Sequence, residues 1–488
     1  MKNEKILPNI FEMLEKLSPI LQAIKHAGGI AYLVGGSVRD LVLGRELKDF
    51  DIEVHGLGLE DLERVLQTFG TVVLVGKQFG VLRLYHLDVD WSLPRKDSIG
   101  RKPEVIFDQT MTLEQACRRR DLTINAMAIN LTPDDGGRAA LEQAVSMGIF
   151  EFIIIDPYHG LEDIKNKRLR AVDQELFIQD PLRFFRVMQF IGRFDMQPDH
   201  ELTVLCQTMV LSDDNYTIAR ERIFEEIKKL LLKSKRPSLG FRWLKSIGRL
   251  QEIFPELYLL VGVPQRKDYH PEGDVFEHAM QALDAAVLYD NYHETSWGSG
   301  GSSEDEKFLI AIAALCHDLG KATTTDEDLH CHGHEEAGVI PAQKLLKRLT
   351  DDIFLNKAVS KLVRHHLMPF SLLREGASVR AYKRLAARLW PEVTMRQLGL
   401  VALADYRGRN GTNSEPLDLY QDRFDQFILK AQDANVVHRP EQAVLLGRHL
   451  IGIIEPGPEM GKLLDKAYDI QIDEGIVDLE ELKKRVLR

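Results

Sequence analysis

The stretch that decides the fold is LVGGSVRDLVLGRELKDFDIEV, which runs from Leu33 to Val54. Apolar residues before Gly35 predict a short strand, the two glycines predict a turn, and SVRDLVLG predicts a short helix. The run FDIEV alternates apolar and acidic residues and predicts a second strand. Strand-like runs continue to about residue 155, so this part of the chain is predicted to be a mixed α/β domain.

The same stretch carries residues suited to nucleotide chemistry. Gly35 and Gly36 would let backbone amides approach phosphates, and the following helix N-terminus favours anions. Asp49 and Asp51 stand two residues apart in a strand-like run, so their carboxylates project from one face. Such a pair can hold two Mg²⁺ ions, one activating a 3′-hydroxyl and one stabilising the leaving pyrophosphate. Either piece alone is more typical of a turn with surface acids, but together they predict a nucleotidyl-transfer site.

Length and composition bound the remaining possibilities. The 488 residues suggest about three domains. Hydrophobic residues make up 44% and charged residues 28%, which excludes a disordered, collagen-like or disulfide-dense chain. No apolar run of about 18 residues occurs, and the N-terminus lacks a secretory pattern, so no membrane association is predicted. Four scattered cysteines favour a reducing cytoplasm.

The charge distribution allows nucleic-acid binding despite an acidic total. The formal net charge is −11, which alone argues weakly against a nucleic-acid partner. The segment Lys228–Leu250, however, holds eight Lys or Arg residues and no acid. This segment is either a phosphate-binding surface or a solvated helix face with counter-charges elsewhere.

Four further motifs follow the first one in order, and after Asp156 the apolar pattern becomes helical. They are RRRDLTINAMAIN (118–130), DPYHGLEDI (156–164), QDPLRFFR (179–186) and RERIFEEIKKLL (220–231). With the opening stretch, they resemble the motifs of the class II tRNA nucleotidyltransferase (CCA-adding enzyme) and bacterial poly(A) polymerase family. Five motifs in family order over about 200 residues make this resemblance specific.

The resemblance implies roles for individual residues. It implies that Asp49 and Asp51 bind catalytic Mg²⁺. It implies that the triphosphate is contacted or supported by Gly35, Gly36 and Arg39. It also implies that the ribose is surrounded by Arg119, Asp121 and Asn125. Glu53 extends the acidic strand to the same face and is not assigned to metal.

The motif QDPLRFFR suggests how a base could be selected without a template. Asp180 and Arg183 are three residues apart in a helical pattern and share a face. The carboxylate can accept from the amine of cytosine or adenine while the guanidinium donates to the ring nitrogen. Uracil and guanine would leave buried polar groups unpaired, at about 1–3 kcal/mol each. Arg186 would reach the phosphates. Taken alone, an ordinary surface ion pair would explain the same two residues.

Two details bear on specificity. The family motif usually begins with Glu-Asp, whereas this chain has Gln179 before Asp180. We therefore predict that base selection persists but is looser. The basic segment PRKDSIGRKPEVIFDQ (94–109) has about the length of the family's flexible loop, which CC-adding members tend to lack. VGKQFGV (75–81) is closer to the CCA-adding pattern than to that of poly(A) polymerases.

A second constellation lies further along the chain. HPEGDVFEH (270–278), ALCHDLGK (314–321) and ALADYRG (402–408) resemble the HD phosphohydrolase pattern. The resemblance implies that a divalent transition metal is bound by His278, His317, Asp318 and Asp405. Such a metal would acidify a bound water for attack on a phosphate ester. A second metal could be held by His334, His365 and His366. We interpret His330-Cys331-His332 as a polar loop, because no second pair has zinc-site spacing.

These observations combine into one expected architecture. It is an α/β (α+β) nucleotidyltransferase head, an all-α neck and body, and an all-α HD-type domain. The expected boundaries are 1–155 for the head, 156–262 for the neck, 263–435 for the HD domain and 436–488 for a helical tail. The segment 447–464 resembles the tail of HD-containing family members.

The expected function is template-independent CCA addition to the tRNA acceptor end from CTP and ATP, with a second, HD-domain activity on phosphate termini. A poly(A) polymerase, or an enzyme that adds only A or only CC, stays open. In a different class of function, the HD domain would be the main enzyme and the head a nucleotide sensor. The sequence does not indicate an oligomeric state.

Overall fold

The computed structural model describes residues 6–47, 50–75, 80–97, 105–132, 153–212, 218–288, 303–413 and 415–487. Asp49 and much of the segment 94–109 and of VGKQFGV therefore lie outside the described residues. The chain folds into two compact units, Met1–Ile223 and Phe224–Arg488. This division falls inside the expected neck, 156–262, and the four-part division stays a prediction.

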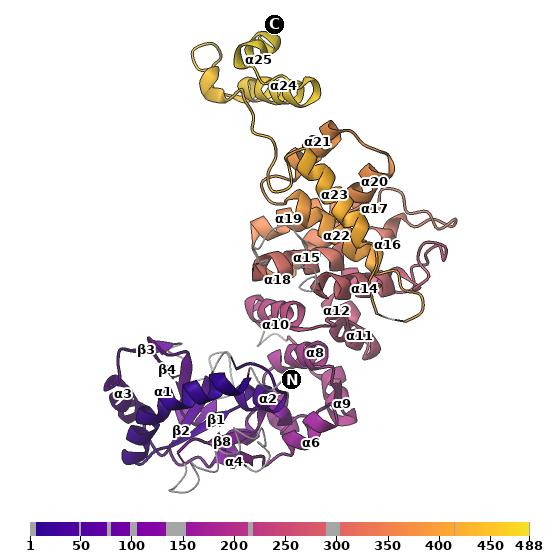
Figure 1. Cartoon of the computed structure of the whole chain (residues 1–488). Coiled ribbons are helices and arrows are strands. Elements are labelled where there is room, and N and C mark those ends of the chain that lie inside the picture. The colour runs from indigo at the N-terminus through magenta and orange to yellow at the C-terminus, as the bar shows by residue number, and fades with distance from the viewer. Residues whose placement is uncertain are drawn as a thin grey trace. The chain divides into compact units, whose positions relative to one another are not determined.

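Among its described residues, the first unit contains a seven-stranded mixed sheet in the order β3-β4-β5-β2-β1-β8-β9 (Figure 1). The strands are β1 (Ile30–Val34), β2 (Phe50–His55), β3 (Val72–Val75), β4 (Val81–Leu84), β5 (Val89–Ser92), β8 (Ala128–Asn130) and β9 (Ile154–Ile155). β2 pairs in parallel with β5, and the other pairs are antiparallel. A separate hairpin joins β6 (Arg95–Asp97) and β7 (Val105–Phe107).

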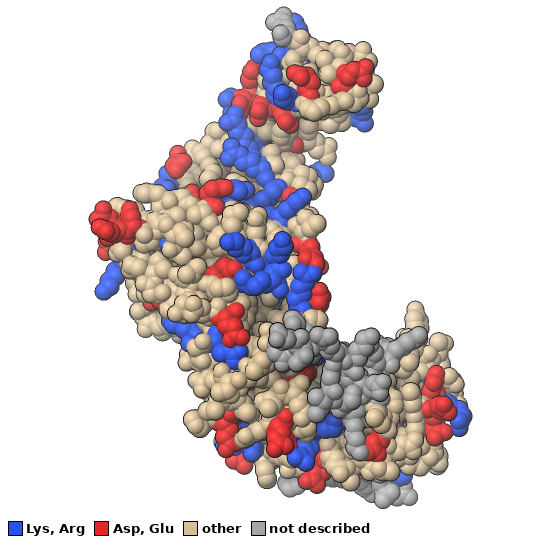
Figure 2. Space-filling model, turned by 180° about the vertical axis from the view of Figure 1, so that it is seen from behind, with Lys and Arg blue, Asp and Glu red and all other residues tan. Residues whose placement is uncertain are grey.

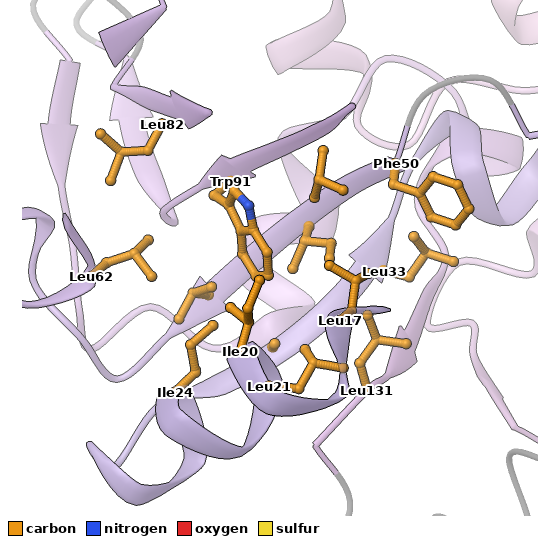
Figure 3. Packing of buried hydrophobic residues seen from close by; sticks show 14 of the residues in the cluster. Leu17, Ile20, Leu21, Ile24, Leu33, Phe50, Leu62, Leu82, Trp91 and Leu131 are labelled. Carbon is orange, nitrogen blue, oxygen red and sulfur yellow. The ribbon is translucent and has the colours of Figure 1, made fainter. Parts of the chain in front are cut away.

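The core of the first unit lies between this sheet and two helices, α1 (Ile6–His26) and α3 (Leu59–Gln67). Leu17, Ile20, Leu21 and Ile24 of α1 face buried sheet residues such as Trp91 (Figure 3). In β2 the apolar residues are buried and the acids between them are less so. Alternation therefore sends the acids to the face opposite α1.

Short helices complete the first unit. They are α2 (Gly36–Val42), α4 (Leu113–Arg118), the 3₁₀ turn η1 (Thr123–Asn125), α6 (Gly160–Lys165), α7 (Gln174–Phe177), α8 (Leu182–Phe194) and α9 (His200–Thr208). The two-residue strands β10 (Arg168–Leu169) and β11 (Gln197–Pro198) pair in parallel. Gly160 begins α6 against η1, and a Cβ there would lie 2.3 Å from the Thr123 carbonyl oxygen. Only glycine allows this approach.

The described part of the second unit is entirely helical (Figure 1). Its longer helices are α10 (Arg220–Lys233, across the division), α11 (Ser238–Ser246), α14 (Val275–Val287), α15 (Glu304–Cys316), α18 (Val339–Leu349), α19 (Ile353–His365), α21 (Val379–Leu389), α22 (Met395–Arg407), α23 (Gln421–Asp433), α24 (Pro458–Glu474) and α25 (Leu479–Val486). Every residue of α15 from Phe308 onward is buried, and α14 and α22 pack against it. A helix that is apolar all round belongs at the centre of a bundle.

These observations confirm the expected fold class, a mixed-sheet head followed by helical regions. The C-terminal helices α24 and α25 have a small core of their own around Leu450 and Leu482. No described helix is both long and apolar enough to cross a membrane.

We predict that Gly160→Ala destabilises the first unit by about 2 kcal/mol, because the added methyl group must displace backbone. The control is Gly461→Ala in α24, where a Cβ would meet nothing within 4 Å. Replacing this helical glycine should be neutral or stabilise by up to about 1 kcal/mol. Urea unfolding monitored by fluorescence checks both, and equal effects of the two variants would contradict the close-approach argument.

Candidate active sites in the two units

A pocket of about 400 Å³ opens on the acidic face of the head sheet. It is lined from β2 by Asp51 and Glu53 and from β5 by Asp90. In the parallel pairing of these strands Asp51 is the direct partner of Asp90. The two carboxylates therefore stand side by side on the open face, and carboxylate oxygens are the ligands that Mg²⁺ prefers.

Residues from other elements close the same pocket. Arg119 follows α4, while Asp180 and Arg183 belong to the start of α8 and the loop before it. The structure thus brings together four of the predicted site residues, Asp51, Arg119, Asp180 and Arg183. Asp49 lies outside the described residues.

The guanidinium of Arg183 is held by backbone rather than by an acid. It donates to the carbonyl oxygens of Leu176 at 2.9 Å and of Arg119 at 2.7 Å. Asp180 accepts from the amide of Leu182 at 3.1 Å and faces Arg222 at 3.5 Å. Asp180 and Arg183 therefore have separate partners, and both still line the pocket. Gln179 is exposed.

The other predicted nucleotide-binding residues form a buried network beside the pocket. Arg39 donates to the Asn125 side-chain oxygen. Asn125 donates to Asp121 at 2.8 Å, and Asp121 accepts from Arg186 Nε at 2.6 Å. Burial alone would raise the pKa of Asp121, but Arg186 and Asn125 hold that pKa well below its ordinary value. The network joins α2, η1 and α8, an arrangement that favours support of the site over direct contact for Arg39.

The glycine turn has the predicted place at the start of α2. Gly35 has φ +69°, and a Cβ on it would lie 2.4 Å from Arg120 Nη1. Gly36 lies over the Arg39 guanidinium. Arg120 also lines the pocket and lies 3.6 Å from Glu53. Arg120 was missed by the sequence reasoning, although it lies within the quoted RRRD run.

Asp90 was also missed by the sequence reasoning. The only sequence signal is the alternation in LDVDW, which places this acid on one face of a strand. Nothing in that run shows that the strand pairs with β2.

The second unit gathers the four predicted HD ligands at one point. His278 Nε2 lies 3.2 Å from His317 Nε2 and 3.1 Å from Asp405 Oδ1. His317 Nε2 lies 3.2 Å from Asp318 Oδ2. All four side chains are at most 4% exposed. They come from α14, the end of α15 and α22.

Backbone carbonyls orient the imidazole rings. The Nδ1 atom of each ring faces a backbone carbonyl oxygen. The carbonyl belongs to Gly408 for His278, to Ala314 for His317, to Cys331 for His334 and to Val363 for His366. A carbonyl only accepts, so each Nδ1 carries a proton, and each Nε2 would offer a lone pair to a ligand once any proton on it is lost. Facing Nε2 atoms beside carboxylates are a donor set that suits a divalent transition metal.

Asp318 connects this cluster to a second pair of histidines. Its Oδ1 lies 3.3 Å from His334 Nε2 and 3.8 Å from His366 Nε2. The two Nε2 atoms lie 3.4 Å apart. One Asp318 carboxylate thus stands between two imidazole pairs, which is the arrangement of a bridging ligand. Of the expected second-metal histidines, His366 belongs to a candidate metal-binding group with His317 and Asp318, and His334 lies against Asp318. His365 is in no such group of the described residues.

Glu272 is a further residue that the sequence reasoning missed. Its Oε1 lies 2.7 Å from His278 Nδ1 and 2.9 Å from His270 Nδ1. Burial alone would lower the pKa of His278, but Asp405 and Glu272 raise it to about 9. A bound cation would displace that proton. The motif HPEGD was the available signal.

Comparison with known proteins matches three domain families to this chain. The poly A polymerase head domain matches residues 31–170, the probable RNA and SrmB-binding site of polymerase A matches 217–260, and the HD domain matches 275–409. The multifunctional CCA protein of Pasteurella multocida is 35% identical over 390 residues, 78% of this chain and 84% of that protein. That of Chromobacterium violaceum is 34% identical over 398 residues, 79% of this chain and 86% of that protein.

Solved structures share the fold. The Thermotoga maritima CCA-adding enzyme complexed with tRNA has a TM-score of 0.55 at 20% identity, covering 99% of this chain and 98% of that one. A CCA-adding enzyme with ATP has a TM-score of 0.59 at 20% identity, covering 99% and 97%. Head and HD domain together define a metal-dependent nucleotidyltransferase that also carries an HD domain. The chain belongs to the multifunctional CCA protein family of class II tRNA nucleotidyltransferases.

We predict that His366→Ala removes one of two transition-metal ions from the second unit, because it deletes an Nε2 ligand next to Asp318. The adjacent His365→Ala is the matched control and should keep both ions. Titration of the full chain with Co²⁺ under excess Mg²⁺, followed by the Co²⁺ visible spectrum, measures the stoichiometry. Equal stoichiometry in the two variants would show that His366 is not a ligand.

Proposed function

We propose that this chain completes tRNA 3′ ends by adding C and A from CTP and ATP, using Mg²⁺ in the head. The observation that carries the proposal is the head pocket, where Asp51 and Asp90 stand side by side and Arg183 and Asp180 line the same space. Family membership supports the same reaction. Because tRNA is the substrate, we place the enzyme in the cytoplasm.

Nucleotidyl transfer joins the terminal 3′-oxygen of RNA to the α-phosphorus of the nucleotide. The bond from that phosphorus to the β-phosphate bridging oxygen breaks, pyrophosphate leaves, and the hydroxyl proton is lost. Asp49, Asp51 and Asp90 would hold Mg²⁺, which supplies charge stabilisation to the attacking and leaving oxygens. Arg119 and Arg120 place positive charge beside these acids, where the triphosphate would bind.

Base selection would rest on Arg183 and Asp180. The carbonyl oxygens of Leu176 and Arg119 hold the guanidinium in one plane, so its remaining N–H groups have a defined direction. A donor beside an acceptor fits the amine and ring nitrogen of cytosine and adenine. The network from Arg39 to Arg186 would hold the glycine turn and α8 in register for this purpose.

The HD site is proposed to hydrolyse phosphate esters at RNA termini. His278, His317, Asp318 and Asp405 would hold a divalent transition metal, which supplies an acidified water for attack on phosphorus. Lys321 Nζ lies 2.7 Å from Asp318 and 2.9 Å from the Gln265 side-chain oxygen, so a cation lies beside the ligands. An RNA end that carries a 3′-phosphate cannot attack a nucleotide, and its hydrolysis would restore the hydroxyl that the head needs.

The alternatives share the head chemistry. A poly(A) polymerase, or an enzyme that adds only A or only CC, would use the same carboxylates. Offering tRNA that ends before CCA, or at C or CC, with each nucleotide and sequencing the products separates these activities. A head that only senses nucleotide would incorporate none.

We predict that Asp51→Asn lowers nucleotide incorporation about 10³-fold, because it removes a metal ligand worth several kcal/mol. Asp405→Asn is its counterpart and should abolish phosphate release while leaving incorporation intact. Each variant is the folding control of the other. Incorporation by Asp51→Asn at the parental rate would contradict the head assignment.

Base selection gives a second prediction. Arg183→Lys keeps the charge but loses the planar fork, so the preference for C and A over U and G should fall about 10–100-fold. Gln179→Glu should raise the preference, since an added carboxylate next to Asp180 would restrict Arg183 further. Competition assays with mixed nucleotides measure both. An unchanged preference in Gln179→Glu would show that this position does not loosen selection.

A further inference from the structure

Helix α21 presents three arginines on one exposed face. Arg380, Arg384 and Arg388 follow one another at intervals of four residues, and all three are exposed. Residues at this spacing lie in one row on a helix, about 6 Å apart along its axis. Lys383 of the same helix is turned away and pairs with Glu441.

The row of arginines borders a pocket of about 360 Å³. Its apolar wall includes Met368 and Leu372 of α20 (Met368–Arg374) and Leu385 of α21. Asp473 of α24 also lines it and pairs with Arg384. A row of arginines beside an apolar wall fits a linear ligand in which charged groups alternate with flat apolar groups.

Two of the three guanidinium groups are available to bind a ligand. Within the described residues, Arg380 and Arg388 make no ion pair with any acid, whereas Arg384 has Asp473. Figure 2 shows Lys and Arg side chains gathered on one face of the second unit. In a chain of net charge −11 this is a local reversal of sign.

We infer that the α21 arginine face, Arg380, Arg384 and Arg388, binds the phosphate backbone of the RNA substrate. Arginine donates in a fork that matches phosphate oxygens. The even spacing along one helix matches a ligand that repeats its negative charge, as a nucleic-acid strand does. The apolar wall would receive a ribose or base between phosphates. The identity of the RNA as tRNA rests on the proposed function, whereas the phosphate chemistry does not.

The test is a double variant, Arg380→Gln with Arg388→Gln, in the full chain. Arg384 is kept, because its pair with Asp473 joins α21 to α24. We expect the Kd for tRNA to rise about tenfold at moderate salt, and the slope of log affinity against log salt to fall by about two, one phosphate for each arginine. Filter binding at several KCl concentrations measures both quantities.

The matched control is Lys16→Gln with Arg64→Gln, which removes the same charge. These exposed side chains lie on α1 and α3, on the sheet face away from the head pocket. The control should keep the parental Kd and salt slope. An unchanged thermal unfolding midpoint shows that the double variant is folded.

The outcomes separate this inference from the proposed function. If the parental chain adds nucleotides to tRNA but the double variant binds tRNA like the control, the inference is wrong. If tRNA binding is unchanged while an acidic peptide binds the parental chain and not the variant, the face serves a protein and the inference is also wrong. If no nucleotide is added but tRNA binding falls as expected, only the proposed function fails.

Discussion

The parallel pairing of β2 with β5 is the constraint on which the head depends. It sets Asp51 beside Asp90 and, one residue further, Ile52 beside Trp91. Because side chains alternate between the faces of a strand, this one register sends both acids to the open face and both apolar residues to the core. A shift by one residue would bury carboxylates against α1 and expose Trp91. The packing that stabilises the sheet therefore also positions the acids.

Much of this could be predicted from the sequence because the decisive signals are local. The glycine turn, the alternation in FDIEV and the order of the motifs all lie within short segments, and they led to the correct fold class. The meeting of His278, His317, Asp318 and Asp405 also followed from motifs, although they span three helices. Resemblance supplied that long-range information, not periodicity.

The rest depended on tertiary contacts that no short segment reveals. Asp90 becomes a neighbour of Asp51 only through strand pairing. Arg39 and Asn125 are buried because α2 and η1 pack together, and neither motif alone reveals the hydrogen bond between their side chains. His365 and His366 are adjacent in sequence, and only the geometry at the end of α19 determines which one turns toward Asp318.

The two sites solve the same electrostatic problem differently. In the head pocket, acids and arginines line one open space, so the cation and triphosphate of the proposed reaction would bind side by side with modest desolvation. In the HD site the carboxylates are almost fully buried, and their charge is balanced within the protein. Arg409 lies 2.7 Å from Asp405, as Lys321 does from Asp318. These two cations would otherwise oppose a metal, but they also offset the negative charge that an arriving phosphate ester would meet. A buried acidic centre flanked by fixed cations therefore supports the proposal that the HD site acts on phosphate esters.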